Sequence, residues 1–153
     1  MNKNITRSKY NVDKDTSKRT YNDIIFDSEM EMKYYRDVVL PQVESGEIVN
    51  FEMQKTIKLQ PEFKRNDKKI SAITYVADFV VQYSNGKEVV VDVKGCPDSI
   101  AKLKRKMLWY YYPDMDYKWL CLSKIDGGWC DWEYVDKQRK LRKKNKKLSG
   151  DAS

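Results

Sequence analysis

The chain has 153 residues, of which 35% are charged, and it carries a formal net charge of +7 with no histidine. This length suits one domain with a real hydrophobic core. The absence of histidine excludes Ser-His-Asp and Cys-His catalysis, and also a nuclease with a histidine base. There is no Walker loop and no GxGxxG motif, so the available chemistry is that of carboxylates, lysine and hard metal ions.

Localisation is inferred from what the sequence lacks. It has no apolar run of 18 residues and begins with a polar stretch, so we expect neither a membrane span nor a signal peptide. Cys96, Cys121 and Cys130 fit no zinc spacing, and we expect three reduced thiols. Together these features predict a cytoplasmic protein.

The positive charge is concentrated at the two ends of the chain. Residues 1–20 carry six basic and two acidic residues, and residues 136–153 carry eight and two, whereas residues 21–135 have a small acidic excess. We therefore expect a core domain over 21–135 between a flexible basic N-terminal arm and a basic C-terminal arm. Such arms suit a polyanion, although basic tails also simply aid solubility.

The first element expected in the core is a helix that begins after Ser28. Ser28 as N-cap and Glu31 at the third helical position form a capping box. Pro41 is expected to end or kink this helix. The apolar stripe of the helix consists of Met30, Tyr34 and Val38.

Three strands are expected after this helix. Alternating apolar residues over 48–59, interrupted at Lys55, predict a half-buried strand or two strands with a break. Residues 64–69 are interpreted as a charged connection. The segments 73–83 and 89–93 are apolar on both faces, which is typical of central strands. Gly86, in the turn between these two segments, predicts that they form a hairpin.

The register of that hairpin decides whether two carboxylates face each other. A two-residue turn would place Asp78 opposite Val93. A three-residue turn with left-handed Gly86 would pair Tyr83 with Lys87 and place Asp78 opposite Asp92. We predict the second register, in which a divalent cation and a nearby lysine would offset the repulsion between the carboxylates.

The C-terminal half predicts two helices and one strand. Asp98 or Ser99 is a suitable N-cap for a helix that ends before Pro113. We expect a strand over 117–122, a turn over 126–128 and a helix over 131–148 that leaves the body after Val135 and frays at its end. The expected buried stripe of the first helix is Ile100, Leu103, Met107 and Tyr110, and its other face carries Lys102, Lys106 and Trp109.

This order of elements predicts an α/β fold with a mixed central sheet flanked by helices. Within it, Asp78, Asp92 and Lys94 have the side chains that a metal-dependent phosphodiesterase needs. Carboxylates hold Mg²⁺ or Mn²⁺, the metal activates a water molecule, and a cation stabilises the charge that develops on phosphorus. The Val93 carbonyl is a further candidate ligand. Glu31 is interpreted as a helix cap that could also bind the metal.

The residues Glu31, Asp78 and Asp92-Val93-Lys94 resemble the E…D…(D/E)xK pattern of the PD-(D/E)xK nuclease superfamily. The chain is most similar to small phage-encoded members long grouped as a domain of unknown function, which look like Holliday-junction resolvases and endonuclease I. Ala77 replaces the proline of the pattern, and Asp92 stands where glutamate is commoner. The matching stretches are Phe26-Asp27-Ser28, Gly46-Glu47-Ile48, Leu59-Gln60-Pro61, Tyr75-Val76-Ala77-Asp78-Phe79, Asp92-Val93-Lys94-Gly95 and Tyr112-Pro113.

The resemblance implies a restriction-endonuclease-like core and a metal-dependent DNA endonuclease that acts on branched DNA in phage recombination. It implies that Asp78, Asp92, Val93 and Glu31 surround the metal, that Lys94 assists catalysis, and that Gln60 lies near the site. A homodimer is expected because two strands must be cut symmetrically. The alternatives are a nickase or packaging nuclease, a non-catalytic nucleic-acid-binding protein that kept the fold, and a structural domain in which Asp92 and Lys94 form a simple ion pair.

Overall fold

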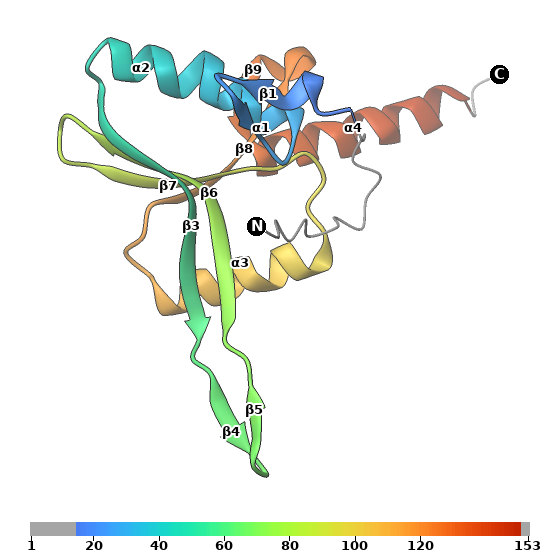
Figure 1. Cartoon of the computed structure of the whole chain (residues 1–153). Helices are drawn as coiled ribbons and strands as arrows, with labels where there is room; N and C mark the ends of the chain where they lie inside the picture. Colours follow the sequence, from blue (N-terminus) through green and yellow to red (C-terminus); the bar gives the residue numbers. More distant parts are fainter. Residues whose placement is uncertain (1–14, 151–153) are drawn as a thin grey trace.

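The computed structural model describes residues 15–150, and a five-stranded sheet of order β3-β6-β7-β8-β9 lies at its centre (Figure 1). The strands are β1 (Thr20–Tyr21), β2 (Ile24–Ile25), β3 (Ile48–Gln60), β4 (Phe63–Arg65), β5 (Lys68–Ile70), β6 (Ile73–Tyr83), β7 (Glu88–Val93), β8 (Tyr117–Ser123) and β9 (Gly128–Asp131). The helical segments are η1 (Ser17–Arg19), α1 (Glu29–Tyr34), η2 (Tyr35–Val39), α2 (Leu40–Glu44), α3 (Ser99–Tyr111), η3 (Lys124–Asp126) and α4 (Trp132–Gly150).

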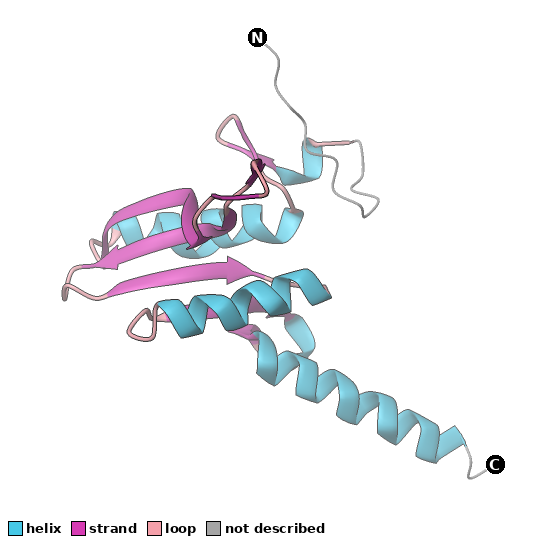
Figure 2. Ribbon diagram, turned by 90° about the horizontal axis from the view of Figure 1, so that it is seen from below, coloured by secondary structure: helices cyan, strands magenta, loops and turns pink. Residues whose placement is uncertain are grey.

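The sheet is mixed and lies between two helical layers. β7 and β8 are parallel and joined through α3, whereas the other neighbours in the sheet are antiparallel. The segment from α1 to α2 covers one face, and α3 and α4 lie on the other (Figure 2). The predicted α/β fold with a mixed sheet flanked by helices is therefore confirmed. β9 and the β4–β5 hairpin were not expected from the sequence.

The turn between β6 and β7 has the three-residue form that the sequence predicted. The Tyr83 N–H donates to the Lys87 carbonyl (2.8 Å), and Gly86 is left-handed with φ of 85°. The ladder pairs Phe79 with Val91, so the next pair along the strands is Asp78 and Asp92. The register that brings these two carboxylates together is confirmed.

Two neighbouring strands change the face they bury at Gln54 and Asp78. Gln54 has a positive φ of 55° at the position of β3 that lies opposite Asp78. Before this point in β3, Phe51 and Met53 pack on the α1 side, whereas Ile57 and Leu59 pack on the α3 side. A left-handed residue in a strand re-aims the following side chains. The interruption of the apolar alternation at Lys55 leaves a break in this segment open, but the sequence pattern does not predict a change of face.

Pro41 was expected to end or kink the first helix, and the helical segment continues past it through α2 with altered hydrogen bonding. Ser28 caps α1 as predicted, accepting from the Glu31 N–H (3.1 Å). Pro41 has no N–H to bond to the carbonyl four residues earlier. The chain instead passes through the π-helical segment η2, where the Leu40 N–H bonds to the Tyr35 carbonyl. Pro41 therefore changes the hydrogen-bonding pattern of the helix, while Glu31 remains beside the sheet.

The apolar residues of α3 that were expected to be buried are mostly exposed to solvent. Ile100, Leu103 and Tyr110 are 61%, 59% and 79% exposed, and Leu108 is the buried residue of the helix. Arg105 faces inward, with its guanidinium 3.8 Å from the centre of the Trp119 ring. The expectation failed because cation–π stacking, which periodicity of apolar residues does not register, fixes the rotation of the helix.

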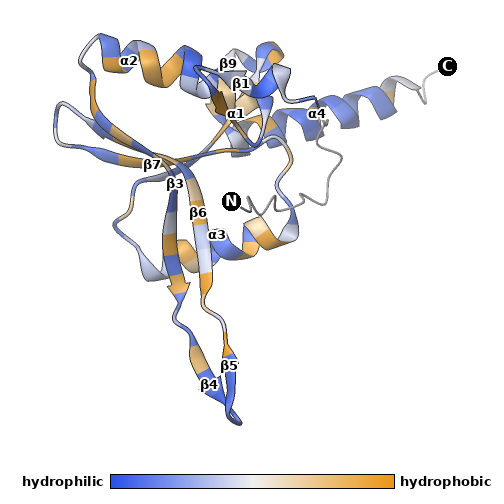
Figure 3. Ribbon diagram, in the orientation of Figure 1, coloured by the Kyte–Doolittle hydropathy of each residue, from blue (hydrophilic) through white to orange (hydrophobic). Residues whose placement is uncertain are grey.

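The C-terminal helix remains attached to the body further than expected. α4 is helical to Gly150, and its outer part is almost wholly hydrophilic (Figure 3). Arg139 donates to the Gly95 carbonyl (2.8 Å), and Arg142 forms an ion pair with Asp126 (2.6 Å). The helix therefore separates from the body after Arg142 and not after Val135. Most of the predicted N-terminal arm lies outside the described residues.

Three further observations concern cysteines and membranes. Cys96, Cys121 and Cys130 are all free, and Cys121 lies opposite Cys130 in the β8–β9 ladder. Among residues 15–150, no helix is both long enough and apolar enough to cross a bilayer.

The inward position of Arg105 gives a test of the α3 rotation. Arg105→Ala should lower the free energy of unfolding by about 2 kcal/mol, because it removes a shielded cation–π contact. Its ion pair with the exposed Glu133 adds little. Urea unfolding followed by tryptophan fluorescence would measure the loss. Lys106→Ala, on the exposed side of the same helix, is the control, and equal stability of both variants would contradict the packing described.

Candidate active site

Two aspartates join β6 and β7 at the point where their backbone ladder ends. The Asp78 N–H donates to Asp92 Oδ1 (2.9 Å), and the Val93 N–H donates to Asp78 Oδ2 (2.8 Å). Each carboxylate thus accepts a backbone hydrogen bond from the other strand. Beyond this point β7 pairs with β8 and β6 continues with β3, so the pair sits in the fork of the sheet.

Lys94 is the cation closest to these carboxylates. Its Nζ lies 3.4 Å from Asp92 Oδ2, and its side chain is a quarter exposed while that of Asp92 is fully buried. Lys94 follows directly after the end of β7 and is two residues from Asp92, so the two side chains lie on one face, as expected. Lys94 therefore reaches from solvent to the buried carboxylate.

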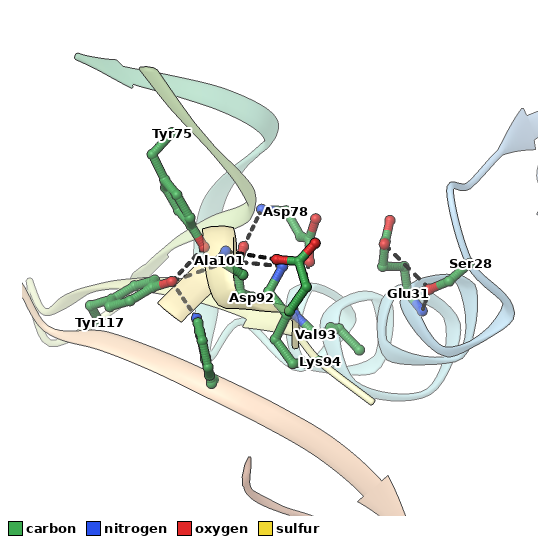
Figure 4. A network of polar contacts seen from close by, with 11 residues as sticks. Ser28, Glu31, Tyr75, Asp78, Asp92, Val93, Lys94, Ala101 and Tyr117 are labelled. Carbon is green, nitrogen blue, oxygen red and sulfur yellow. Dashed lines mark hydrogen bonds and ion pairs between the residues drawn. The ribbon is translucent and has the colours of Figure 1, made fainter. Parts of the chain in front are cut away.

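Glu31 approaches the aspartates from α1 (Figure 4). Its side chain is buried, and Oε1 accepts from the Ser28 hydroxyl (3.3 Å). Oε2 is buried and has no hydrogen-bond partner within residues 15–150. Met30, which packs in the core and lies against Gly95, holds this turn of α1 to the end of β7. Glu31 is thus both part of the helix cap and a third carboxylate at the site.

The carboxyl groups are costly to ionise in this environment. Burial raises the pKa of Glu31 from its usual 4.5 to about 8, and the charges of Asp78 and Asp27 add to this rise. Burial also raises the pKa of Asp78 and of Asp92, while Lys94 acts in the opposite direction on both. A further cation in the site would favour the ionised form of all three carboxyls.

A hydrogen-bonded group of aromatic side chains contacts Asp92. The Tyr117 hydroxyl donates to Asp92 Oδ2 (3.1 Å) and accepts from the Trp119 indole N–H. Tyr75 forms a further hydroxyl contact with Tyr117. Burial and the charge of Asp92 raise the pKa of Tyr117 well above its usual range, so Tyr117 remains a neutral donor. This network fixes the orientation of one carboxylate.

Two polar residues at the site were missed in the sequence. Gln54 hydrogen-bonds to Asp78, and Asp27 lies close enough to raise the pKa of Asp78 and Glu31. Both line a cavity of about 150 Å³ that also includes Asp78 and Phe79. Asp27 belonged to a stretch that carried the resemblance. Nothing in the sequence marked Gln54 as a site residue, because it occupies an ordinary polar position in a strand of alternating apolar and polar residues.

Gln60 does not join the site, which corrects its place among the candidates. It pairs with Ile73 at the end of β3, beyond a bulge. Ile73 is five residues from Asp78 on β6, so at about 3.3 Å per residue the separation is roughly 17 Å. The other candidates, Glu31, Asp78, Asp92, Val93 and Lys94, are brought together.

The residues present fit a hard divalent cation with a mostly aqueous shell. Within residues 15–150, no group of three or more His, Cys, Asp and Glu side chains is arranged so that it could hold a metal ion. Mg²⁺ commonly takes one or two carboxylates and keeps several waters. Asp78 and Asp92 supply the carboxylates, and the unpaired oxygen of the buried Glu31 is available to a metal ion or its water.

Comparison with known protein families identifies the family to which the chain belongs. A family model for proteins of unknown function, DUF1064, matches residues 7–126. The chain belongs to the DUF1064 family. The matched range includes all the residues of the site and ends before α4. No curated protein matches the chain.

The raised pKa of Glu31 predicts a pH dependence of stability in metal-free protein. Between pH 4.5 and about 8 the folded chain keeps a proton on Glu31 that the unfolded chain has lost. Stability must therefore fall as pH rises through this window and level off above it. Thermal unfolding in EDTA from pH 5 to 9 should show this fall, and Glu31→Gln should be more stable than the natural protein at pH 8.5.

The control is Glu29→Gln, which removes an exposed carboxylate from the same turn of α1. It should retain the fall in stability seen with the natural protein. Parallel pH profiles for the natural protein and Glu31→Gln would contradict the buried, protonated state of Glu31.

Proposed function

We propose that this DUF1064 protein is a metal-dependent DNA endonuclease. The observation that carries the proposal is the placing of Asp78 opposite Asp92, with Lys94 on the same face and Glu31 approaching from α1. Burying two opposed carboxylates is costly unless a cation binds them. The order of these residues along the chain agrees with the resemblance to PD-(D/E)xK nucleases.

Each residue has a distinct role in this proposal. Asp78 and Asp92, with the Val93 carbonyl, would hold Mg²⁺ or Mn²⁺, and Glu31 would bind it or its water. When bound, the metal lowers the pKa of water and polarises a phosphate oxygen. Lys94 would orient the attacking water or stabilise the charge on phosphorus. Tyr117 keeps Asp92 in place.

The substrate class follows from charge and resemblance. The outer part of α4 carries a dense row of basic residues, and Arg139 ties this helix to Gly95, next to Lys94. A basic helix fixed beside the carboxylates suits the phosphate backbone of DNA. We propose a structure-selective enzyme that acts on branched DNA in phage recombination or DNA processing, in the cytoplasm of the host cell.

A cleavage assay tests this proposal. Labelled linear duplex, single-stranded and four-way-junction DNA would be incubated with protein in Mg²⁺, Mn²⁺ or EDTA. The natural protein should cut the junction preferentially and only with metal. Asp92→Asn and Lys94→Ala should each lower the rate by at least about 10²-fold, because each removes a group that stabilises the transition state.

Glu88→Gln is the matched control, since it removes an exposed carboxylate from the same strand as Asp92. It should cut at the natural rate. DNA binding without cutting in either metal, unchanged in Asp92→Asn, would instead indicate a non-catalytic nucleic-acid-binding protein.

We further propose that the active form is a homodimer joined through α3. Ile100, Leu103 and Tyr110 are exposed, and together with Met107, which is partly buried against the core, they recur at alternating intervals of three and four. This is the spacing of a coiled-coil seam. A second copy of the helix related by two-fold symmetry would cover the stripe with the same residues.

Leu103→Glu should convert the dimer to an 18.2 kDa monomer, because it places a charge in the seam. Light scattering after size-exclusion chromatography would measure the mass. Lys106→Glu, on the same helix outside the stripe, should remain dimeric. A natural protein that is monomeric at micromolar concentration would contradict this assembly.

A further inference from the structure

The β4–β5 hairpin extends away from the domain as a two-stranded ribbon (Figure 1). All six of its strand residues are exposed, so it packs against no core. Four of the six are cationic, namely Lys64, Arg65, Lys68 and Lys69. We infer that this ribbon is a nucleic-acid-binding arm that enters a groove of duplex DNA.

The cross-strand pairs of the ribbon place like charges together. Lys64 lies opposite Lys69, and Arg65 lies opposite Lys68. Like charges directly opposite each other destabilise a hairpin, and a free two-stranded hairpin is marginal in water. Glu62 offsets only Lys69 (3.0 Å), and the other three cations make no ion pair among the described residues. The ribbon does not itself neutralise the repulsion between these cations, and a bound polyanion would do so.

The shape of the ribbon suits a groove. Asn66 and Asp67 both have positive φ, of 48° and 62°, which is the two-residue turn that matches the twist of a hairpin. Alternation along each strand puts Arg65 and Lys68 on one face, and Lys64 and Lys69 on the other. The major groove of B-DNA admits a two-stranded ribbon, and phosphates line both of its walls.

The base of the ribbon offers apolar contacts. Phe63 lies opposite Ile70, on the same face as Arg65 and Lys68. Both are exposed, at 45% and 38%. Apolar side chains in the major groove contact the methyl group of thymine. The ribbon therefore offers cations for the backbone and a small apolar pair for base edges.

The reach of the ribbon sets where it would contact DNA relative to the carboxylates. Ile70 and Asp67 precede Asp78 by eight and eleven residues, which at about 3.3 Å per residue is at most roughly 26 and 36 Å. One turn of B-DNA is about 34 Å. If the site cuts DNA, which rests on the proposed function, the ribbon would hold the duplex up to about one turn from the cut.

The test measures binding without cleavage. Anisotropy of a fluorescein-labelled 30-base-pair duplex would be recorded in EDTA from 50 to 300 mM NaCl. The ribbon variant Lys64→Gln/Arg65→Gln/Lys68→Gln/Lys69→Gln should bind at least about 10-fold more weakly at 100 mM NaCl. Its slope of log affinity against log salt should fall by about 0.9 for each lost phosphate contact, or roughly 3 to 4 in total.

The matched control removes four positive charges elsewhere, as Lys33→Gln/Lys87→Gln/Lys118→Gln/Lys124→Gln. It should change the slope by less than about 1. Lys64→Arg/Lys68→Arg/Lys69→Arg keeps the charge and should keep the natural affinity. If the fourfold ribbon variant unfolds, Arg65→Gln/Lys68→Gln at the exposed tip replaces it, with half the change in slope.

The outcomes separate the ribbon from the nuclease. Equal affinity and slope for the ribbon variant and the natural protein would overturn the arm, and so would a natural protein that does not bind duplex DNA. Weaker binding by the ribbon variant together with no cleavage by the natural protein in any metal would support the arm and overturn the nuclease. Hydroxyl-radical footprinting should show protection near the arm that the ribbon variant loses.

Discussion

The site depends on two hydrogen bonds between side chain and backbone at the end of the β6–β7 ladder. Asp78 and Asp92 each accept an N–H from the opposite strand, so the carboxylates themselves take over the pairing where the strands part. This keeps buried backbone groups bonded at the fork. It also holds two like charges together, which favours a bound cation. If the site binds a metal, as proposed, the stability of the fork and the affinity for the metal would both depend on these two residues.

The left-handed Gln54 lies at the point where one pair of strands passes from the proposed site towards the proposed arm. At this residue β3 changes the face that it buries, and β6 changes with it at Asp78. On one side of the change the strands pack under α1, which brings Glu31. On the other side they pack under α3 and then leave the domain as the β4–β5 ribbon. In a regular strand, Ile57 and Leu59 would lie on the same face as Phe51 and Met53, and the change at Gln54 moves them to the α3 side.

Local sequence rules predicted the parts of the fold that depend on neighbours in the chain. The Ser28 cap, the turn at Gly86 and the facing of Asp78 and Asp92 all follow from capping, turn chemistry and strand alternation. The errors arose where distant residues, or a departure from regular helical hydrogen bonding, determine the structure. Pro41 is accommodated by a π-helical segment, α3 is rotated by the stacking of Arg105 on Trp119, and Gln54 replaces Gln60 beside Asp78. None of these contacts leaves a periodic trace in the sequence.

The charges of the domain are separated, and this separation agrees with the proposed binding of nucleic acid. Acidic groups are buried at the fork, where burial raises their pKa values, and basic groups are displayed on α4 and the ribbon. A polyanion would be repelled by ionised carboxylates at the site. Positive elements at its edges, one of them fixed to Gly95 through Arg139, would bring phosphates close before they meet the acidic centre. In the proposed function, a divalent cation would neutralise the carboxylates and would also contact the phosphate. Lys94 and the backbone hydrogen bonds offset part of the cost of burying Asp78 and Asp92. In the proposed function, a bound metal ion would offset more of it.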